Sequence, residues 1–306
     1  KVKQGNPLEE SIFYQQADCE FKAGNLDQAV DTFLLVTRRW PRGKYPDHSL
    51  YFATECVLDA ATKARAIGRI EKLAEAELLL DKFAREYKDS ELLNSHYLQR
   101  GHFLVLRGQP GDLDKAEKLF QSVLKSSAQS QTQGEARYEL ARLLNGRGNH
   151  SAAVSILQPL ANSVMKNGKT TIPEILILYP HLLIQTKEYK AARAAAQGYL
   201  THFKKGTNRD QAWSMIASAS AMDKSWKPTS EAVSALINEH SDSPIVARTA
   251  ERVAEIAWDA KQYGECVRYF TILEKTGVKS PYHAKALSGL GWSEYHLKHY
   301  EAAESI

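Results

Sequence analysis

Residues 259–270, DAKQYGECVRYF, contain the pattern that decides the fold of this chain. A short polar turn is followed by an apolar or aromatic residue and, three positions later, by a small residue on the apolar face of a second helix. Related patterns occur in FKAGNLDQAVDTF (21–33), LRGQPGDLDKAEKLF (106–120), LNGRGNHSAAVSIL (144–157), IQTKEYKAARAAA (184–196) and HLKHYEAAESI (296–306). Each stretch predicts the turn of one helix-turn-helix repeat.

The small residue of the second helix recurs along the whole chain. Eight positions align, at intervals of 47, 40, 37, 39, 40, 34 and 37 residues: Ala29, Ala76, Ala116, Ala153, Ala192, Ala232, Cys266 and Ala303. A helix pair cannot bury its own apolar stripe, so neighbouring pairs must stack, and small residues let their helices approach closely. The sequence therefore predicts an all-α fold, a right-handed solenoid of about eight repeats with these eight side chains buried. Residues 1–306 are expected to form a single solenoid whose last repeat is truncated.

These repeats resemble the tetratricopeptide repeat family, from about Leu8 to Ile306. The last repeat carries Gly291, Tyr300 and Ala303 at the family's positions, and the first and sixth repeats close with Pro41 and Pro244. The sixth repeat departs from the pattern with Thr229 at the usual aromatic position, and the fifth has Pro180 where a small residue is usual. HEAT and Sel1-like repeats are competing architectures of the same class. The irregular repeats are most similar to bacterial cell-envelope members of the family, so an envelope or periplasmic location is favoured over the cytoplasm.

The composition excludes several classes of protein. The chain is 43% hydrophobic and 25% charged, values typical of a globular chain and not of a disordered one. Its longest apolar runs fall far short of the roughly 18–20 residues that span a bilayer. A net charge of +4 without a basic run does not indicate nucleic-acid binding. Because the chain begins with Lys1 and stops at Ile306 within an expected helix, we expect it to be part of a longer protein.

No sequence motif indicates catalysis, a cofactor or a metal. The chain contains no phosphate loop, dinucleotide fingerprint, GxSxG or HExxH motif, so it is predicted not to be an enzyme. His296 and His299 lie three residues apart, but no carboxylate or cysteine set accompanies them, and no metal site is predicted. Cys19, Cys56 and Cys266 are an odd number at unrelated spacings, and Cys266 occupies a packing position.

The resemblance implies where a ligand would bind. In the family, the first helix of each repeat lines a concave groove and its ninth residue points into that groove. Carried over to this sequence, the ninth positions are Asp18, His102, Arg142, His181, Ala221, Glu255 and Trp292. His102, Arg142 and His181 would form a weakly basic stretch, and Glu251, Glu255 and Asp259 an acidic patch, because residues four apart share a helix face. Trp292 and Tyr295, with Lys285 and Ser288, would form an aromatic platform. The alternative is a solvated helix face or, for the aromatic residues, core between repeats.

The predicted function is a non-catalytic scaffold that binds a peptide or protein segment in this groove. Chaperone-tail binding is disfavoured because the family's carboxylate clamp needs Asn where Tyr138 and Ile177 stand. A nucleic-acid-binding helical repeat is the main alternative, and a helical glycan-processing enzyme, which would need paired carboxylates in a cavity, is a second. The apolar C-terminal end, with Tyr300, Ala303 and Ile306, also suggests self-association.

Overall fold

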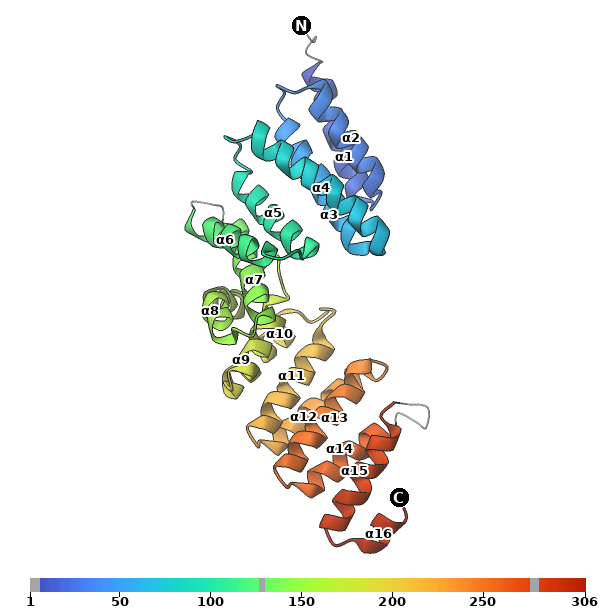
Figure 1. Cartoon of the computed structure of the whole chain (residues 1–306). Helices are drawn as coiled ribbons and strands as arrows, with labels where there is room; N and C mark the ends of the chain where they lie inside the picture. Colours follow the sequence, from blue (N-terminus) through green and yellow to red (C-terminus); the bar gives the residue numbers. More distant parts are fainter. Residues whose placement is uncertain (1–5, 127–129, 276–280) are drawn as a thin grey trace. The chain divides into compact units, whose positions relative to one another are not determined.

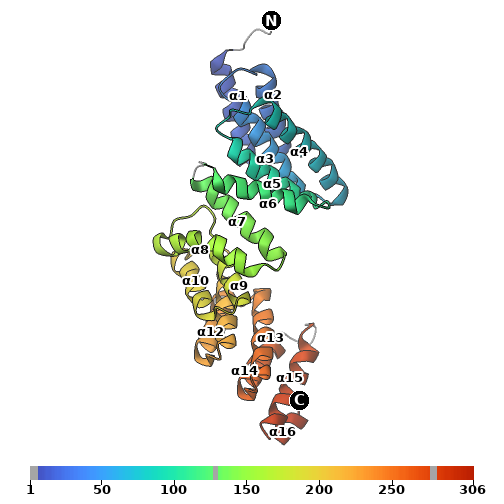
Figure 2. The same cartoon turned by 60° about the vertical axis from the view of Figure 1, so that its left-hand side comes forward.

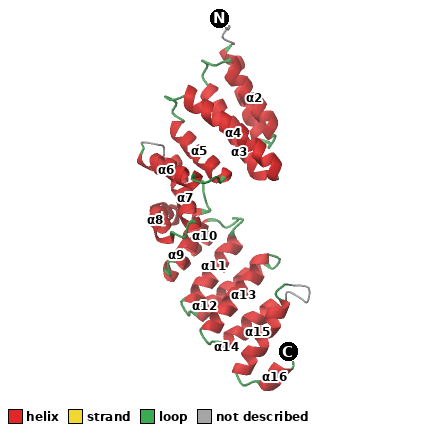
Figure 3. Ribbon diagram, viewed as in Figure 1, coloured by secondary structure: helices red, strands yellow, loops and turns green. Residues whose placement is uncertain are grey.

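The computed structural model of the protein describes residues 6–126, 130–275 and 281–306. In these residues it contains sixteen helices and no strand (Figures 1 and 3). The helices are α1 Pro7–Lys22, α2 Leu26–Arg39, α3 Pro46–Lys63, α4 Ala66–Glu86, α5 Leu93–Arg107, α6 Asp112–Lys125, α7 Ser130–Gly146, α8 His150–Asn167, α9 Ile175–Gln185, α10 Tyr189–His202, α11 Arg209–Met222, α12 Trp226–His240, α13 Pro244–Asp259, α14 Tyr263–Glu274, α15 His283–His296 and α16 Tyr300–Glu304. The predicted all-α repeat fold is confirmed.

The helices belong to two compact units, residues 1–143 and 144–306. In the first unit, α2 packs against both α1 and α3, α4 packs against α3, and α5 packs against α6. In the second unit, each helix from α9 to α15 packs against its predecessor and its successor. Figures 1 and 2 show these successive antiparallel pairs within each unit. That residues 1–306 form a single solenoid stays a prediction. No helix in the described part of the chain combines the length and apolar character needed to cross a membrane.

Six turns between paired helices close in the same way. In the turn after α13, the Lys261 N–H donates to the Trp258 carbonyl and the Gln262 N–H to the Ala257 carbonyl, both at 2.8 Å. This double closure is the Schellman motif, in which one residue takes a left-handed conformation. The left-handed residues of the six turns are Gly24, Gly148, Lys187, Lys224, Lys261 and Lys298.

The left-handed lysines give the repeat register of the second unit. They lie 37 residues apart, and each is followed two residues later by the aromatic residue that begins the second helix: Tyr189, Trp226, Tyr263 and Tyr300. The small position comes three residues after the aromatic one, so Thr229, and not Ala232, is the equivalent of Ala192 and Cys266. The predicted register of the sixth repeat was therefore wrong by three residues. Thr229 is tolerated there because its hydroxyl donates to the Ser225 carbonyl at 2.9 Å, which satisfies a side chain that is completely buried.

Most of the predicted packing positions lie in the core. Seven of the eight small residues are at most 1% exposed: Ala29, Ala76, Ala116, Ala153, Ala192, Ala232 and Cys266. The expectation is wrong for Ala303, which is partly exposed and lines a surface cavity. The physical reason is that Ala303 lies on the five-residue helix α16, which packs on α15, and no described helix follows to cover it.

We expect the substitution Ala192→Leu or Ala153→Leu to lower the free energy of unfolding by about 1–3 kcal/mol. Both alanines have no exposed surface, so the added atoms would force neighbouring side chains out of place. The measurement is urea denaturation followed by circular dichroism. The neighbouring Ala191 is exposed on the same helix as Ala192, and Ala191→Leu is the control, expected to change stability little. Equal midpoints for Ala192→Leu and Ala191→Leu would contradict the packing described above.

Candidate functional site

The first helices of the repeats carry the candidate site. Seven residues each precede a residue of positive φ by six positions, and therefore occupy equivalent places on first helices: Asp18, His102, Arg142, His181, Ser218, Glu255 and Trp292. Ser218 replaces the expected Ala221, because the sixth repeat is shifted by three residues. Ala221 itself is completely buried and cannot face a groove. All of these residues except Asp18 line a surface cavity.

In the first unit, a cavity of about 390 Å³ lies against the first helices α1, α3, α5 and α7. Phe21 contributes to it from α1, Glu55 and Asp59 from α3, and the predicted site residues His102 and Arg142 from α5 and α7. Figure 1 shows α3 and α5 near each other in the same unit. The structure thus brings together two site residues that are 40 positions apart in the sequence.

A charged triad forms one wall of this cavity. The Glu139 carboxylate receives hydrogen bonds from the Arg142 guanidinium at 3.1 Å, and the His102 Nε2 atom lies 3.6 Å from Glu139 Oε1. Burial by itself would lower the pKa of His102, but the adjacent Glu139 carboxylate raises it above its ordinary value. Burial opposes ionisation of Glu139 as well, yet His102 and Arg142 hold the pKa of Glu139 below its usual range. The three side chains therefore favour one another's charged forms.

The expected basic stretch is wrong for the first unit. His102 and Arg142 share their cavity with three carboxylates, Glu55, Asp59 and Glu139. Those carboxylates come from two different repeats, and their separation in the sequence concealed their proximity. The cavity is mixed in charge, with a small acidic excess.

In the second unit, His181 lines a different cavity of about 390 Å³ with residues from α9, α11 and α13. Ser218 belongs to its lining, and so do Arg248 and Arg252. Burial lowers the pKa of His181, and the nearby His150 and Arg252 lower it further, so His181 is neutral at pH 7. The positive charge of this cavity comes from the two arginines, which the sequence analysis missed. The sequence does contain a signal for them: Arg248 and Arg252 lie four residues apart, at a spacing that places them on the same helix face as Glu255 and Asp259.

The predicted acidic patch on α13, made of Glu251, Glu255 and Asp259, is partly occupied by ion pairs. The Lys285 ammonium of α15 lies 2.6 Å from Glu251 and also pairs with Glu255. Asp259 makes no ion pair with any residue that the structure describes. Glu255, Asp259 and Lys285 line a cavity of about 490 Å³ together with two tryptophans, Trp258 and Trp292. Lys285 thus bridges the acidic patch instead of supporting an aromatic platform.

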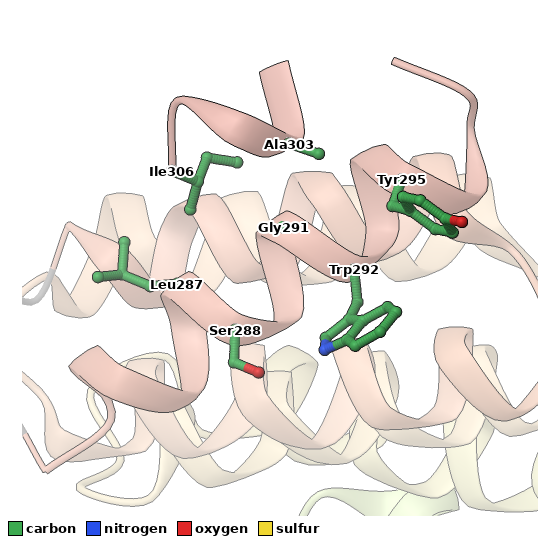
Figure 4. A pocket seen from close by; sticks show the side chains of 7 residues that line it. All are labelled: Leu287, Ser288, Gly291, Trp292, Tyr295, Ala303 and Ile306. Carbon is green, nitrogen blue, oxygen red and sulfur yellow. The ribbon is translucent and has the colours of Figure 1, made fainter. Parts of the chain in front are cut away.

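The predicted aromatic residues lie at the C-terminal end of the second unit. Trp292 and Tyr295 are 57% and 52% exposed and contact each other edge to face, with ring centroids 5.9 Å apart. They line a further cavity of about 560 Å³, to which Leu287, Ala303 and Ile306 also contribute. Figure 4 shows the Trp292 and Ser288 side chains on one side of α15 and the segment with Ile306 on the other. Trp292 therefore borders two cavities.

Cys266, His296 and His299 do not line any of the four cavities described above. Burial raises the pKa of the Cys266 thiol to about 11, as expected for a packing residue. His296 stacks on Tyr263 with ring centroids 4.5 Å apart, and His299 Nδ1 lies 2.7 Å from a Glu294 carboxylate oxygen. Among the residues that the structure describes, no three side chains are grouped as metal ligands would be.

Comparison with known sequences identifies one repeat directly. Residues 12–42 match the family model described as tetratricopeptide repeat, and this stretch includes most of α1 and all of α2. No curated protein matches the chain significantly.

Comparison with solved structures extends the likeness to nearly the whole chain. A tetratricopeptide-repeat sensor protein of the signal-transduction ATPase type from Pyrococcus horikoshii matches with a TM-score of 0.61 and 13% identity, over 96% of this chain and 43% of that one. Pseudomonas aeruginosa pilF matches with a TM-score of 0.57 and 12% identity, over 78% of this chain and 95% of its own. The C-terminal part of a repeat protein from Cytophaga hutchinsonii matches with a TM-score of 0.50 and 13% identity, over 95% and 98%. At these identities the likeness concerns the fold alone.

Proposed function

The chain is built from tetratricopeptide-like repeats, and we propose that it is a non-catalytic scaffold that binds a peptide or protein segment along its first helices. Repeats of this kind are generally protein-interaction modules. The observation that supports the proposal is the repeated placement of the first-helix residues. Six equivalent positions in six repeats border cavities, and they carry different chemistry: His102, Arg142, His181, Ser218, Glu255 and Trp292.

Such a surface suits an extended partner. Each cavity offers a few polar groups beside apolar walls. Many modest contacts along a row of repeats would provide affinity, and the changing charge would provide specificity.

Catalysis by carboxylates is not favoured by the cavity of the first unit. A glycosidase needs one carboxyl group that stays protonated as a general acid. Glu139 is instead held ionised by His102 and Arg142, Asp59 pairs with Lys63 at 2.8 Å, and Glu55 accepts a hydrogen bond from Gln99. Nothing supports the nucleic-acid alternative, and three carboxylates in this cavity would repel phosphates.

The experiment is quantitative capture of partner proteins from the native organism on the immobilised chain. We expect the pair of substitutions Arg142→Glu and His181→Glu to reduce capture of specific partners by about tenfold or more, since both positions face cavities. The control is Lys118→Glu with Lys190→Glu, two exposed residues on the second helices α6 and α10. Melting curves by circular dichroism must coincide for all variants. The proposal is refuted if the variant with Arg142→Glu and His181→Glu captures partners as well as the unmodified chain does. It is also refuted if the control variant loses as much capture as this variant.

Two further expectations belong to this proposal. Ile306 lines the C-terminal cavity and is 44% exposed, and Tyr300, which contacts the cavity residue Tyr295, is 58% exposed. These exposed apolar side chains support self-association through that end. Sedimentation velocity at several concentrations tests it, and a monomer at all of them would exclude it.

A location in a bacterial envelope or periplasm also stays a prediction, and cell fractionation would decide it.

A further inference from the structure

One face of α13 is divided into a basic half and an acidic half. Five residues spaced three or four positions apart share this face: Ile245, Arg248, Arg252, Glu255 and Asp259. The first three line the cavity beside α9 and α11, and the last two line the cavity beside α15. Two cavities of opposite charge therefore adjoin along one helix of the second unit.

Of the four charged residues on this face, only Glu255 makes an ion pair within the described residues. Arg248, Arg252 and Asp259 are exposed and make no ion pair within the described residues of the chain. Asp259 is the last residue of α13, and the end of a helix is the less favourable one for an anion because the backbone carbonyls there carry partial negative charge. Glu255 shares the single ammonium of Lys285 with Glu251, so that group of three keeps one net negative charge. Ion pairing within the fold therefore accounts for little of this pattern.

The two cavities suit different side chains. Paired arginines form forked hydrogen bonds with a carboxylate. On the acidic side, Trp258 and Trp292 stand beside Asp259, and an indole face attracts a guanidinium or ammonium group. The exposed position of Trp292 leaves its ring available for such a contact.

We propose that this face of α13 binds one extended segment of a partner protein that carries an acidic side chain and, about three residues away, an arginine or lysine. The midpoint of Arg248 and Arg252 is seven residues from the midpoint of Glu255 and Asp259, which is about 10 Å along a helix. A chain in the extended polyproline II conformation covers about 9 Å in three residues, and because this conformation has three residues per turn, side chains three positions apart point to the same side. The inference rests on the proposed function and adds to it the chemistry and spacing of the partner.

The probes are capped octapeptides of Gly and Ser, with Glu at position 3 and Arg at position 6. Three matched peptides replace Glu by Gln, replace Arg by Gln, or place Glu and Arg next to each other. Isothermal titration at low salt should give a Kd for the spaced peptide at least about tenfold lower than for any of the three. Raising the salt concentration to about 0.15 M should reduce this advantage, because the charges are exposed.

Charge-reversed variants locate the two contacts. Arg252→Glu should abolish the advantage of Glu over Gln, and Asp259→Lys should abolish the advantage of Arg over Gln. The control Lys227→Glu, at an exposed position on α12 in the same unit, should bind like the unmodified chain. Each variant is first checked for an unchanged melting curve.

The proposal is overturned if the spaced peptide binds no more tightly than the matched peptides, or if Asp259→Lys leaves the preference for Arg intact. Tighter binding of oligothymidine than of the spaced peptide would overturn it as well, since phosphates would engage only the arginines. If partner capture still depends on Arg142 and His181 in that case, the scaffold function stands without this specificity. Failure of both experiments would reject the scaffold function too.

Discussion

Replacing Phe120 by alanine should lower the free energy of unfolding of the first unit by about 3–5 kcal/mol. The ring has no exposed surface and lies so closely against Gly101 that any Cβ at that position would overlap it. It also contacts the His102 ring, with centroids 5.9 Å apart. Removing it would leave a cavity between α5 and α6 that the paired helices can close only in part.

Urea denaturation followed by circular dichroism measures this loss. Leu113→Ala is the control, because Leu113 lies on the same helix but is 40% exposed, and its removal should cost about 0.5 kcal/mol. Since each repeat is supported mainly by its neighbours, hydrogen exchange should speed up most in α5 and α6. A loss below about 1 kcal/mol for Phe120→Ala would show that this ring does not hold the helix pair together.

The contact between Gly101 and Phe120 illustrates which parts of the fold were predictable. Close packing of the paired helices requires small and aromatic residues at fixed positions, so this pattern can be recognised in the sequence of nearly every repeat. The register of the sixth repeat was missed because its packing position holds Thr229, while a small residue, Ala232, stands three positions later. A threonine does not indicate a close-packing position by its size. The 37-residue spacing of the four lysines was the signal that could have found it.

The candidate site was predictable one residue at a time, but not as a set of charges. Each predicted residue on α5, α7, α9, α13 and α15 lines a cavity or makes an ion pair. Some of the charged partners, however, come from other repeats. Lys285 neutralises Glu251 from 34 positions away, and Glu139 reaches His102 from 37 positions away. Periodicity places residues on a helix face, whereas the local charge depends on which side chains of the next repeat meet them. Those contacts between neighbouring repeats are visible only in the structure.

The second large effect is expected at the turn between α5 and α6, which carries the inserted Gln109-Pro110-Gly111. Asp112 closes this turn. Its carboxylate receives two hydrogen bonds from the Arg107 guanidinium, both at 2.8 Å, and one from the Gln109 backbone N–H at 3.1 Å. Arg107 also reaches Glu77 on α4 at 2.6 Å, so the turn is attached to the preceding repeat.

Replacing Asp112 by alanine should lower the free energy of unfolding by about 2–3 kcal/mol at pH 7, because Arg107 and the Gln109 N–H would lose their acceptor in a place where Asp112 is 1% exposed. Hydrogen bonds from Arg107 hold the pKa of Asp112 below its ordinary value of 3.8. A carboxyl group whose pKa is lower in the folded state stabilises the fold above its unfolded pKa and loses that contribution as the pH falls through the folded one. Urea denaturation at pH 7 and near pH 3 compares the unmodified chain with the Asp112→Ala variant. The difference between their free energies of unfolding should be smaller near pH 3. Asp31→Ala, at an exposed position on α2, is the control and should change stability by less than about 0.5 kcal/mol at either pH. A difference for Asp112→Ala that is the same at both pH values would show that the charge of Asp112 does not stabilise the turn.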